Sequence, residues 1–143
     1  MDNTLFSLNG RIVTAREAVV PVTDRGFLYG DGVFETLHAY GRKLFRLRAH
    51  LKRLAHGAAH LFFDPAPDLR VLAKWLQAAV DAAGFPEASA RLTLSRGAGP
   101  RGPSISAQLR PTVVIMVTRH FRAPEEKGAV AVLAGFRRQE SAV

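Results

Sequence analysis

The sequence predicts an α+β fold in which two helices cover an antiparallel sheet. Two kinds of pattern lead to this expectation: short segments that alternate apolar and polar residues, and two longer segments whose apolar residues recur at helical spacing. The chain has 143 residues, 48% of them hydrophobic, which is enough apolar material for one compact core.

The strand pattern begins with a hairpin. The dipeptide Asn9-Gly10 suits both positive-φ positions of a type I′ turn, so its apolar flanks should pair. A glycine turn at Gly41 should likewise return the chain antiparallel to the alternating segment before it. The strands expected are Leu5–Leu8, Arg11–Val13, Val33–Tyr40, Lys43–Arg46, Arg91–Ser95 and Thr112–Thr118.

Two segments have helical periodicity. The first is a leucine-rich stripe from Leu47 to Phe62, which Asp64-Pro65 and Pro67 should end because proline cannot continue the hydrogen-bond ladder. The second begins after Asp68, a good N-cap, and its apolar face runs to Gly84, which suits a left-handed closing position. Its apolar face consists of Leu69, Leu72, Leu76, Ala79, Val80 and Ala83.

Composition and charge limit the classes of function that the chain can have. The net charge of +8 would suit a nucleic-acid-binding protein. The basic residues are scattered, however, and only two tyrosines and one tryptophan are available for stacking. An ordinary solvated surface with some anion contacts is therefore favoured. Cysteine is absent, which excludes disulfides and cysteine-ligated metals, and no metal site is expected. With neither an apolar leader nor an apolar run long enough to span a bilayer, a cytoplasmic protein is expected.

The chain divides by composition near its end. Residues 1–119 should form one small α+β domain, and residues 120–128, charged and containing Pro124, should form a linker. An apolar strand is expected to begin at Ala129. The residues alone leave two alternatives for this strand: it closes the existing sheet, or it starts a second domain at residues 129–143.

Three segments could carry chemistry. In Asp24–Thr36, glycines on both sides of Asp31 permit a tight turn or a close backbone approach, and the strand that follows should point Phe34 and Glu35 to opposite sides. On spacing alone, a glycine turn leading into a core strand is the favoured interpretation.

The second segment is helical and the third is a loop. His50 and Arg53 should share one side of the first helix, where an arginine fork could bind phosphate; a solvated basic face is the plainer alternative. The loop Arg96–Pro103 carries two arginines suited to a carboxylate, or is an ordinary surface loop. It lacks the glycine-lysine-serine/threonine end of a P-loop.

In this order and spacing, the segments resemble the class IV (fold-type IV) pyridoxal-phosphate-dependent aminotransferases, a family that includes branched-chain and D-amino-acid aminotransferases and aminodeoxychorismate lyase. The resemblance rests on D-R-G-x-x-x-G-D-G-V-F-E-T at Asp24–Thr36, H-x-x-R-L at His50–Leu54 and R-G-x-G-x-R-G at Arg96–Gly102. It covers most of residues 5–102. It implies the small N-terminal domain of such an enzyme, followed by the first strand of the cofactor domain.

The resemblance also implies roles for individual residues. Arg53 matches the arginine that holds the phosphate of pyridoxal 5'-phosphate, and Glu35 belongs to a supporting network. The positions that match substrate-binding residues are Tyr29, Phe34, Arg91 and Arg101. Pro103 stands where the D-amino-acid branch has a histidine, and Pro100 interrupts the glycine-arginine-glycine pattern. The interruption by Pro100 brings the loop closer to the lyase-like branch than to the D-amino-acid branch.

The cofactor-binding lysine of the family is expected beyond Val143, because none of Lys43, Lys52, Lys74 and Lys127 has the family's sequence context. The 143-residue chain alone is therefore expected to be inactive. The parent enzyme is expected to be a homodimer that transfers an amino group between an amino acid and a 2-oxo acid. Two alternatives remain: a pyruvate-eliminating aminodeoxychorismate lyase, and a non-catalytic anion-binding domain.

Overall fold

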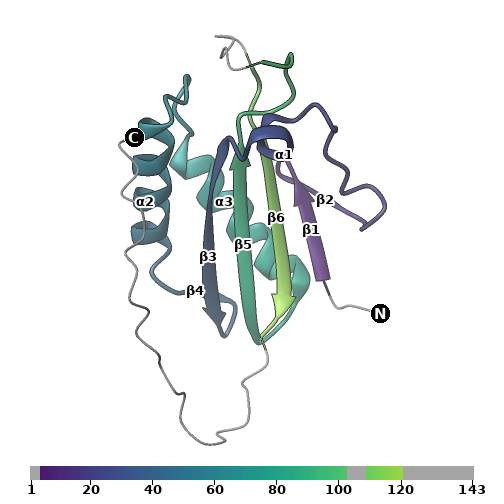
Figure 1. Cartoon of the computed structure of the whole chain (residues 1–143). Helices are drawn as coiled ribbons and strands as arrows, with labels where there is room; N and C mark the ends of the chain where they lie inside the picture. Colours follow the sequence, from purple (N-terminus) through teal and green to yellow (C-terminus); the bar gives the residue numbers. More distant parts are fainter. Residues whose placement is uncertain (1–3, 103–108, 121–143) are drawn as a thin grey trace, which may run out of the picture.

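The computed structural model describes residues 4–102 and 109–120. Within them, six strands form one antiparallel sheet in the order β2-β1-β6-β5-β3-β4, and three helices complete the α+β fold that the sequence predicts (Figure 1). The elements are β1 (Thr4–Leu8), β2 (Arg11–Val13), α1 (Arg25–Tyr29), β3 (Gly32–Tyr40), β4 (Lys43–Leu44), α2 (Leu47–His60), α3 (Leu69–Ala83), β5 (Glu87–Ser95) and β6 (Thr112–Arg119).

The core lies between the sheet and the two long helices. Helices α2 and α3 cover one face of the sheet (Figure 1), and alternate residues of the central strands point towards them. In the described part, neither α2 nor α3 covers the opposite side, which we call the open face; Phe34, Arg91, Thr93 and Val114 lie on it. The core residues are Leu37, Ala39, Leu51, Leu54, Ala58, Phe63, Leu72, Leu76, Ala79, Val80, Ala88, Ala90, Leu92, Leu94, Val113, Ile115 and Val117.

The predicted hairpin turn is confirmed. Asn9 has φ 50° and Gly10 has φ 82°, as a type I′ turn requires. A Cβ atom placed on Gly10 would lie 2.3 Å from Cε2 of Trp75, so the indole ring of α3 occupies the space that a side chain would need. The hairpin thus packs against α3 through the backbone of Gly10.

The second predicted helix is confirmed at both ends, but the first differs. Asp68 Oδ1 accepts hydrogen bonds from the backbone of Arg70 at 2.8 Å and Val71 at 3.4 Å, and Gly84 closes α3 with φ 70°. Helix α2 ends at His60, before the aspartate-proline pair expected to end it. Phe62 adopts φ 54°, which breaks the helix, because a left-handed residue cannot continue a right-handed helix.

The extent of two predicted strands was wrong. Strand β5 begins at Glu87, four residues before the predicted start at Arg91. The strand expected over Lys43–Arg46 is only Lys43–Leu44, since Arg46 turns into the left-handed region with φ 50°. The glycine turn leading into a core strand is present. It is preceded by the short helix α1, which was not predicted and whose first turn is capped by Asp24 Oδ1 accepting from Gly26 N at 2.8 Å. Five residues that include a glycine give too little periodicity to predict a helix.

The predicted division of the chain into domains falls largely outside the described residues. Residues 121–143 hold most of the expected linker at 120–128 and the strand expected from Ala129. The boundary at residue 119 therefore stays a prediction. Among the helices of the described part, none is long and apolar enough to cross a membrane.

Candidate active site

Strand β3 carries functional side chains on both of its faces. Its residues alternate, so Glu35 points towards α2 and is buried, while Phe34 points to the open face and is 56% exposed. The sequence predicts this opposition, and the structure confirms it. Two clusters result, one behind the strand and one in front of it.

The cluster behind β3 is centred on Glu35. Arg53 Nε donates to Glu35 Oε1 and Arg53 Nη2 to Glu35 Oε2, each at 2.6 Å, and His50 Nδ1 lies 2.7 Å from Oε2. The Glu35 side chain is 2% exposed, whereas that of Arg53 is 72% exposed. The pKa of Glu35 is lowered, chiefly by the hydrogen bonds from Arg53; burial opposes this and His50 adds to it. Glu35 is therefore a carboxylate that holds both basic side chains in place.

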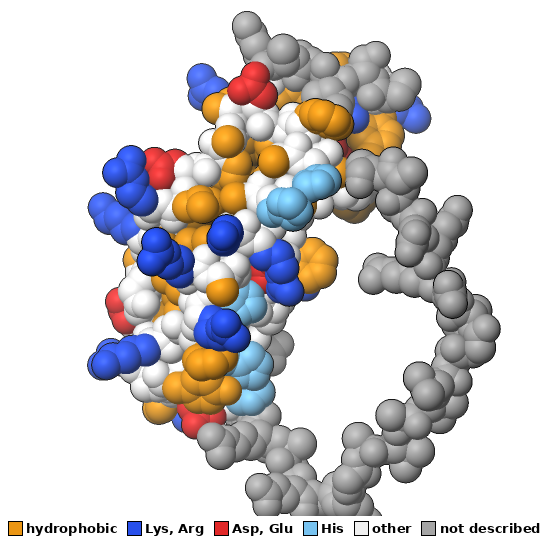
Figure 2. Space-filling model, turned by 90° about the vertical axis from the view of Figure 1, so that its left-hand side faces the viewer, with side chains coloured by type: hydrophobic (Ala, Val, Ile, Leu, Met, Phe, Trp, Pro, Cys, Tyr) orange, Lys and Arg blue, Asp and Glu red, His pale blue; other side chains and the backbone are white. Residues whose placement is uncertain are grey.

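An anion could bind beside this cluster. Arg46, Ala49, His50 and Arg53 line a cavity of about 300 Å³, which we call the anion cavity. Arg53 Nη1 takes no part in the contacts with Glu35, so an arm of the guanidinium is left for a ligand. Figure 2 views the molecule from the side of α2 and shows lysine and arginine side chains gathered over this face. These residues fit a phosphate group, which guanidinium groups bind through paired hydrogen bonds.

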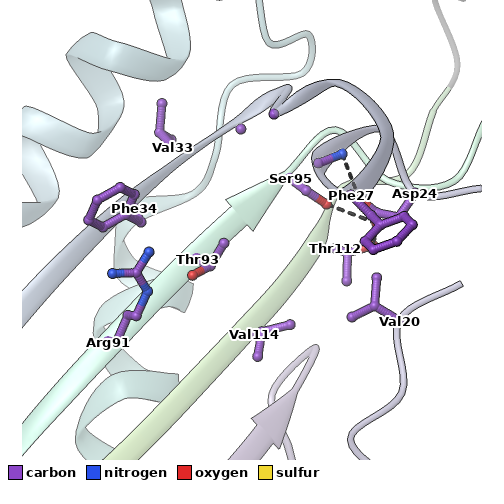
Figure 3. Close-up of a pocket in the computed structure, with 13 residues that line it drawn as sticks. Val20, Asp24, Phe27, Val33, Phe34, Arg91, Thr93, Ser95, Thr112 and Val114 are labelled. Carbon is purple, nitrogen blue, oxygen red and sulfur yellow. Dashed lines mark hydrogen bonds between the residues drawn. The ribbon is translucent and has the colours of Figure 1, made fainter. Parts of the chain in front are cut away.

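A second, larger cavity lies on the open face. It has a volume of about 510 Å³, and at one end the guanidinium carbon of Arg91 lies 3.8 Å from the ring centroid of Phe34 (Figure 3). The cavity therefore combines an apolar wall with a cation held over an aromatic ring. We call it the open-face cavity; it is lined by Val20, Asp24, Gly26, Phe27, Gly30, Gly32, Val33, Phe34, Arg91, Thr93, Ser95, Thr112 and Val114.

The other two predicted substrate-binding residues lie elsewhere. Tyr29 does not line the open-face cavity; its hydroxyl accepts a hydrogen bond from the backbone N–H of Gly102 at 2.9 Å. Arg101 is exposed on the same loop. The structure thus brings together Phe34 with Arg91, and places Tyr29 with the loop that carries Arg101.

The first arginine of that loop has a different role from the one its sequence suggests. Arg96 does bind a carboxylate, but it is the protein's own: Nε donates to Asp31 Oδ2 at 2.7 Å. Arg96 Nη1 donates to Phe62 O at 3.1 Å, and Nη2 donates to Leu61 O. These bonds satisfy carbonyl groups just beyond the end of α2. Arg96 is thus a structural residue that fixes α2 to the turn before β3.

Two aspartates that sequence reasoning did not single out hold the same turn. Asp31 also accepts from Arg25 Nε at 2.9 Å. Burial acts to raise the pKa of Asp31, but hydrogen bonds from Arg96 and Arg25 outweigh burial and lower it. Asp24 accepts from Ser95 Oγ at 2.9 Å and Thr112 Oγ1 at 2.8 Å. Apart from Arg25, these partners lie more than 60 residues away in the sequence, so local patterns carry no sign of those contacts.

The glycine after Asp31 shows why this turn excludes side chains. A Cβ atom on Gly32 would lie 2.7 Å from the carbonyl oxygen of Leu94, a separation that real contacts do not show. The close approach expected of the glycines is therefore present at Gly32. It starts β3 directly against β5 and sets the position of Phe34 and Glu35.

Strand β3 of the antiparallel sheet thus has the basic anion cavity behind it and the largely apolar open-face cavity in front of it. The family model "Amino-transferase class IV" matches residues 32–142. The chain therefore belongs to the class IV aminotransferase family, as its sequence motifs suggest.

Individual relatives agree with this assignment. The chain is 34% identical over 119 residues to the D-alanine aminotransferase of Bacillus licheniformis, a match that covers 83% of this chain and 42% of the relative. The structure resembles 4-amino-4-deoxychorismate lyase from Pseudomonas aeruginosa with TM-score 0.72 and 31% identity, over 85% of this chain and 42% of that one.

A third similarity extends further along the chain. The branched-chain aminotransferase from Thermoproteus uzoniensis matches with TM-score 0.82 and 28% identity, over 95% of this chain and 47% of that one. These three proteins have different activities on one fold, so the fold alone does not select among them. The chain spans less than half the length of the relatives it matches.

Proposed function

We propose that this chain forms the N-terminal part of a pyridoxal-phosphate-dependent aminotransferase that moves an amino group between an amino acid and a 2-oxo acid. The observation that carries the proposal is the opposition on β3. Glu35 fixes Arg53 at 2.6 Å behind the strand, and Phe34 lies 3.8 Å from the Arg91 guanidinium carbon in front of it. A phosphorylated cofactor and an amino-acid side chain need two such neighbouring environments.

In this proposal the anion cavity takes the phosphate. Arg53 would bind phosphate oxygens with the arm that Glu35 leaves free, and Glu35 and His50 would orient Arg53. When bound, pyridoxal phosphate supplies an electron sink that stabilises negative charge at the substrate's α-carbon. The chain's own contribution is to fix the cofactor's position, because correct positioning lowers the entropic part of the barrier.

The substrate would be bound from the open face. Phe34 and Arg91 would contact its side chain within the open-face cavity. Tyr29 and Arg101 lie on α1 and on the adjoining loop, and would contact substrate when a second subunit brings that loop to the site. We therefore propose a cytoplasmic homodimer. Its small domain would comprise residues 1–119, with a linker at 120–128 and the cofactor domain beginning at 129–143.

The covalent cofactor-binding residue is proposed to lie in sequence that follows residue 143. Of the described lysines, Lys43, Lys52 and Lys74, none lines the anion cavity or the open-face cavity. The chain by itself would then bind a phosphate but catalyse no transfer. A lysine is required because only its amine forms the reversible covalent link that such cofactors use.

A lyase is the second candidate. The similarity to 4-amino-4-deoxychorismate lyase from Pseudomonas aeruginosa and Pro100 within the loop favour it. A lyase would use the same phosphate grip but release pyruvate from aminodeoxychorismate with no amino acceptor.

One assay separates these functions. The full-length protein containing this chain, loaded with pyridoxal phosphate, is given a panel of amino acids together with a 2-oxo acid, and the new amino acid is measured. Donor-dependent product supports the transaminase. Pyruvate released from aminodeoxychorismate without any 2-oxo acid supports the lyase. If neither product forms while phosphate binding persists, the chain belongs to a non-catalytic anion-binding protein.

A further inference from the structure

We propose that Arg46 is a second cation of the anion cavity and supplies the net positive charge that binds the cofactor's phosphate. This inference rests on the proposed function, because it assigns a further residue to the phosphate site. The ligand class it predicts is a phosphate monoester dianion. Arg46 would bind the ligand directly, on the side of the cavity away from Glu35.

Helical spacing places Arg46 at this cavity. Arg46 is the N-cap of α2, and Ala49, His50 and Arg53 follow it by three, four and seven residues, so all four lie on one side of the helix. The same four residues line the cavity of about 300 Å³. Arg46 is exposed, so a ligand can reach its guanidinium.

The charges of the cluster explain why a second arginine is needed. Glu35 accepts two hydrogen bonds from Arg53 and lies 2.7 Å from His50, so its negative charge cancels that of one basic partner. A phosphate dianion facing only the Arg53–Glu35 pair would meet little net positive charge. Over the described ranges, the side chain of Arg46 forms no ion pair or hydrogen bond, which leaves its full charge for a ligand.

The backbone at Arg46 gives a second, independent indication. Its φ of 50° is left-handed, and such residues other than glycine are uncommon and cluster at functional sites. N-cap positions favour serine, threonine, aspartate or asparagine, whose side chains cap the first turn. Arg46 makes no side-chain cap bond. A poor N-cap in an unusual conformation is consistent with a residue retained for its guanidinium.

Binding of pyridoxamine 5'-phosphate and of pyridoxamine to the full-length protein without cofactor tests this proposal. Neither ligand forms the covalent link, so the ratio of their affinities, measured by calorimetry, gives the contribution of the phosphate group to binding. Arg46→Gln should lower this ratio about tenfold or more, as expected for a lost charged hydrogen bond. Arg48→Gln is the matched control, because Arg48 carries the same charge on the exposed first turn of α2 but does not line the anion cavity. This substitution should change the affinity ratio less than about twofold.

Arg46→Lys tests whether the effect of Arg46→Gln comes from a folding defect. It keeps the charge and an unbranched side chain but loses the fork, so its ratio should lie between those of the wild type and Arg46→Gln. Equal affinity ratios for Arg46→Gln and Arg48→Gln overturn the role of Arg46. The proposed function still stands in that case if Arg53→Gln abolishes the preference for the phosphorylated ligand. A wild type that does not prefer the phosphorylated ligand overturns both.

Discussion

Both carboxylate oxygens of Glu35 accept hydrogen bonds from Arg53, at 2.6 Å each, although the two side chains differ greatly in exposure. A buried carboxylate thus sets the direction of a guanidinium that remains open to ligands. A bidentate contact is rigid because it fixes the plane of the guanidinium as well as its distance. This relationship leads to the first prediction.

Arg53→Ala should weaken binding of pyridoxamine 5'-phosphate to the full-length protein by about ten- to a hundredfold, because a charged phosphate contact is lost. Relative kcat/KM values among amino-acid substrates should change little, since Arg53 does not line the open-face cavity. Lys52→Ala removes a neighbouring exposed charge from α2 and serves as the control. Unchanged cofactor affinity in Arg53→Ala would contradict the phosphate role.

Phe34→Leu should have the opposite pattern. It removes the ring against which the Arg91 guanidinium lies at 3.8 Å, so KM should rise and the order of preferred amino acids should change. Affinity for pyridoxamine 5'-phosphate should stay within about twofold, a change of less than half a kcal/mol. Tyr40→Leu is the matched control, an exposed aromatic residue of β3 outside the cavity. Equal effects of both substitutions on substrate preference would refute the role of Phe34.

Stability should fall as the solution becomes acidic. The pKa values of Glu35 and Asp31 lie below their ordinary values of 4.5 and 3.8, so each carboxylate contributes stability that is complete above its ordinary pKa. That contribution is lost as pH falls through the lowered pKa, because protonation ends the charged contacts with arginine. Urea unfolding between about pH 6 and 3 should show the decline. Glu35→Gln should flatten it, and an equal slope would count against Glu35.

Arg96→Lys should destabilise the fold by about 1–3 kcal/mol, the cost of leaving buried polar groups without partners. Lysine cannot replace a fork that contacts Asp31 and the carbonyl groups of Leu61 and Phe62 together. Arg101→Lys, on the exposed part of the same loop, should change stability by less than about 0.5 kcal/mol. The free energy of unfolding measured in urea compares the two. A stable Arg96→Lys protein would show that this network is dispensable.

Borohydride reduction of the 143-residue chain in the presence of pyridoxal phosphate should label no specific lysine. Lys43, Lys52 and Lys74 lie outside both cavities, and nothing there would orient a lysine amine towards a bound cofactor. Peptide mapping by mass spectrometry measures the labelling. Stoichiometric modification of a single lysine would show that the cofactor-binding lysine lies within this chain.

Much of the fold could be predicted because its patterns are local. The Asn9-Gly10 turn, the cap at Asp68 and the closing Gly84 each depend on a few adjacent residues. Alternation along β3 likewise predicted that Phe34 and Glu35 face opposite sides. These features follow from backbone preferences that hold in any fold.

The remaining features depend on contacts that are distant in sequence. Arg96 donates to the carbonyl groups of Leu61 and Phe62, which lie just beyond the last turn of α2 and more than 30 residues earlier in the sequence. The motifs found Arg53 and Glu35 but gave no indication that Arg96 is buried and Arg101 exposed. A pattern of charged and glycine residues does not reveal which charges become one another's partners.

The packing of Trp75 on the glycine of the first hairpin has a practical consequence. Trp75 is the only tryptophan of the chain, and its ring fills the space where a side chain at residue 10 would stand. Intrinsic fluorescence excited at the indole band therefore reports on one place, the contact between α3 and the turn between β1 and β2. The protein carries a built-in optical probe of whether its first two strands are docked.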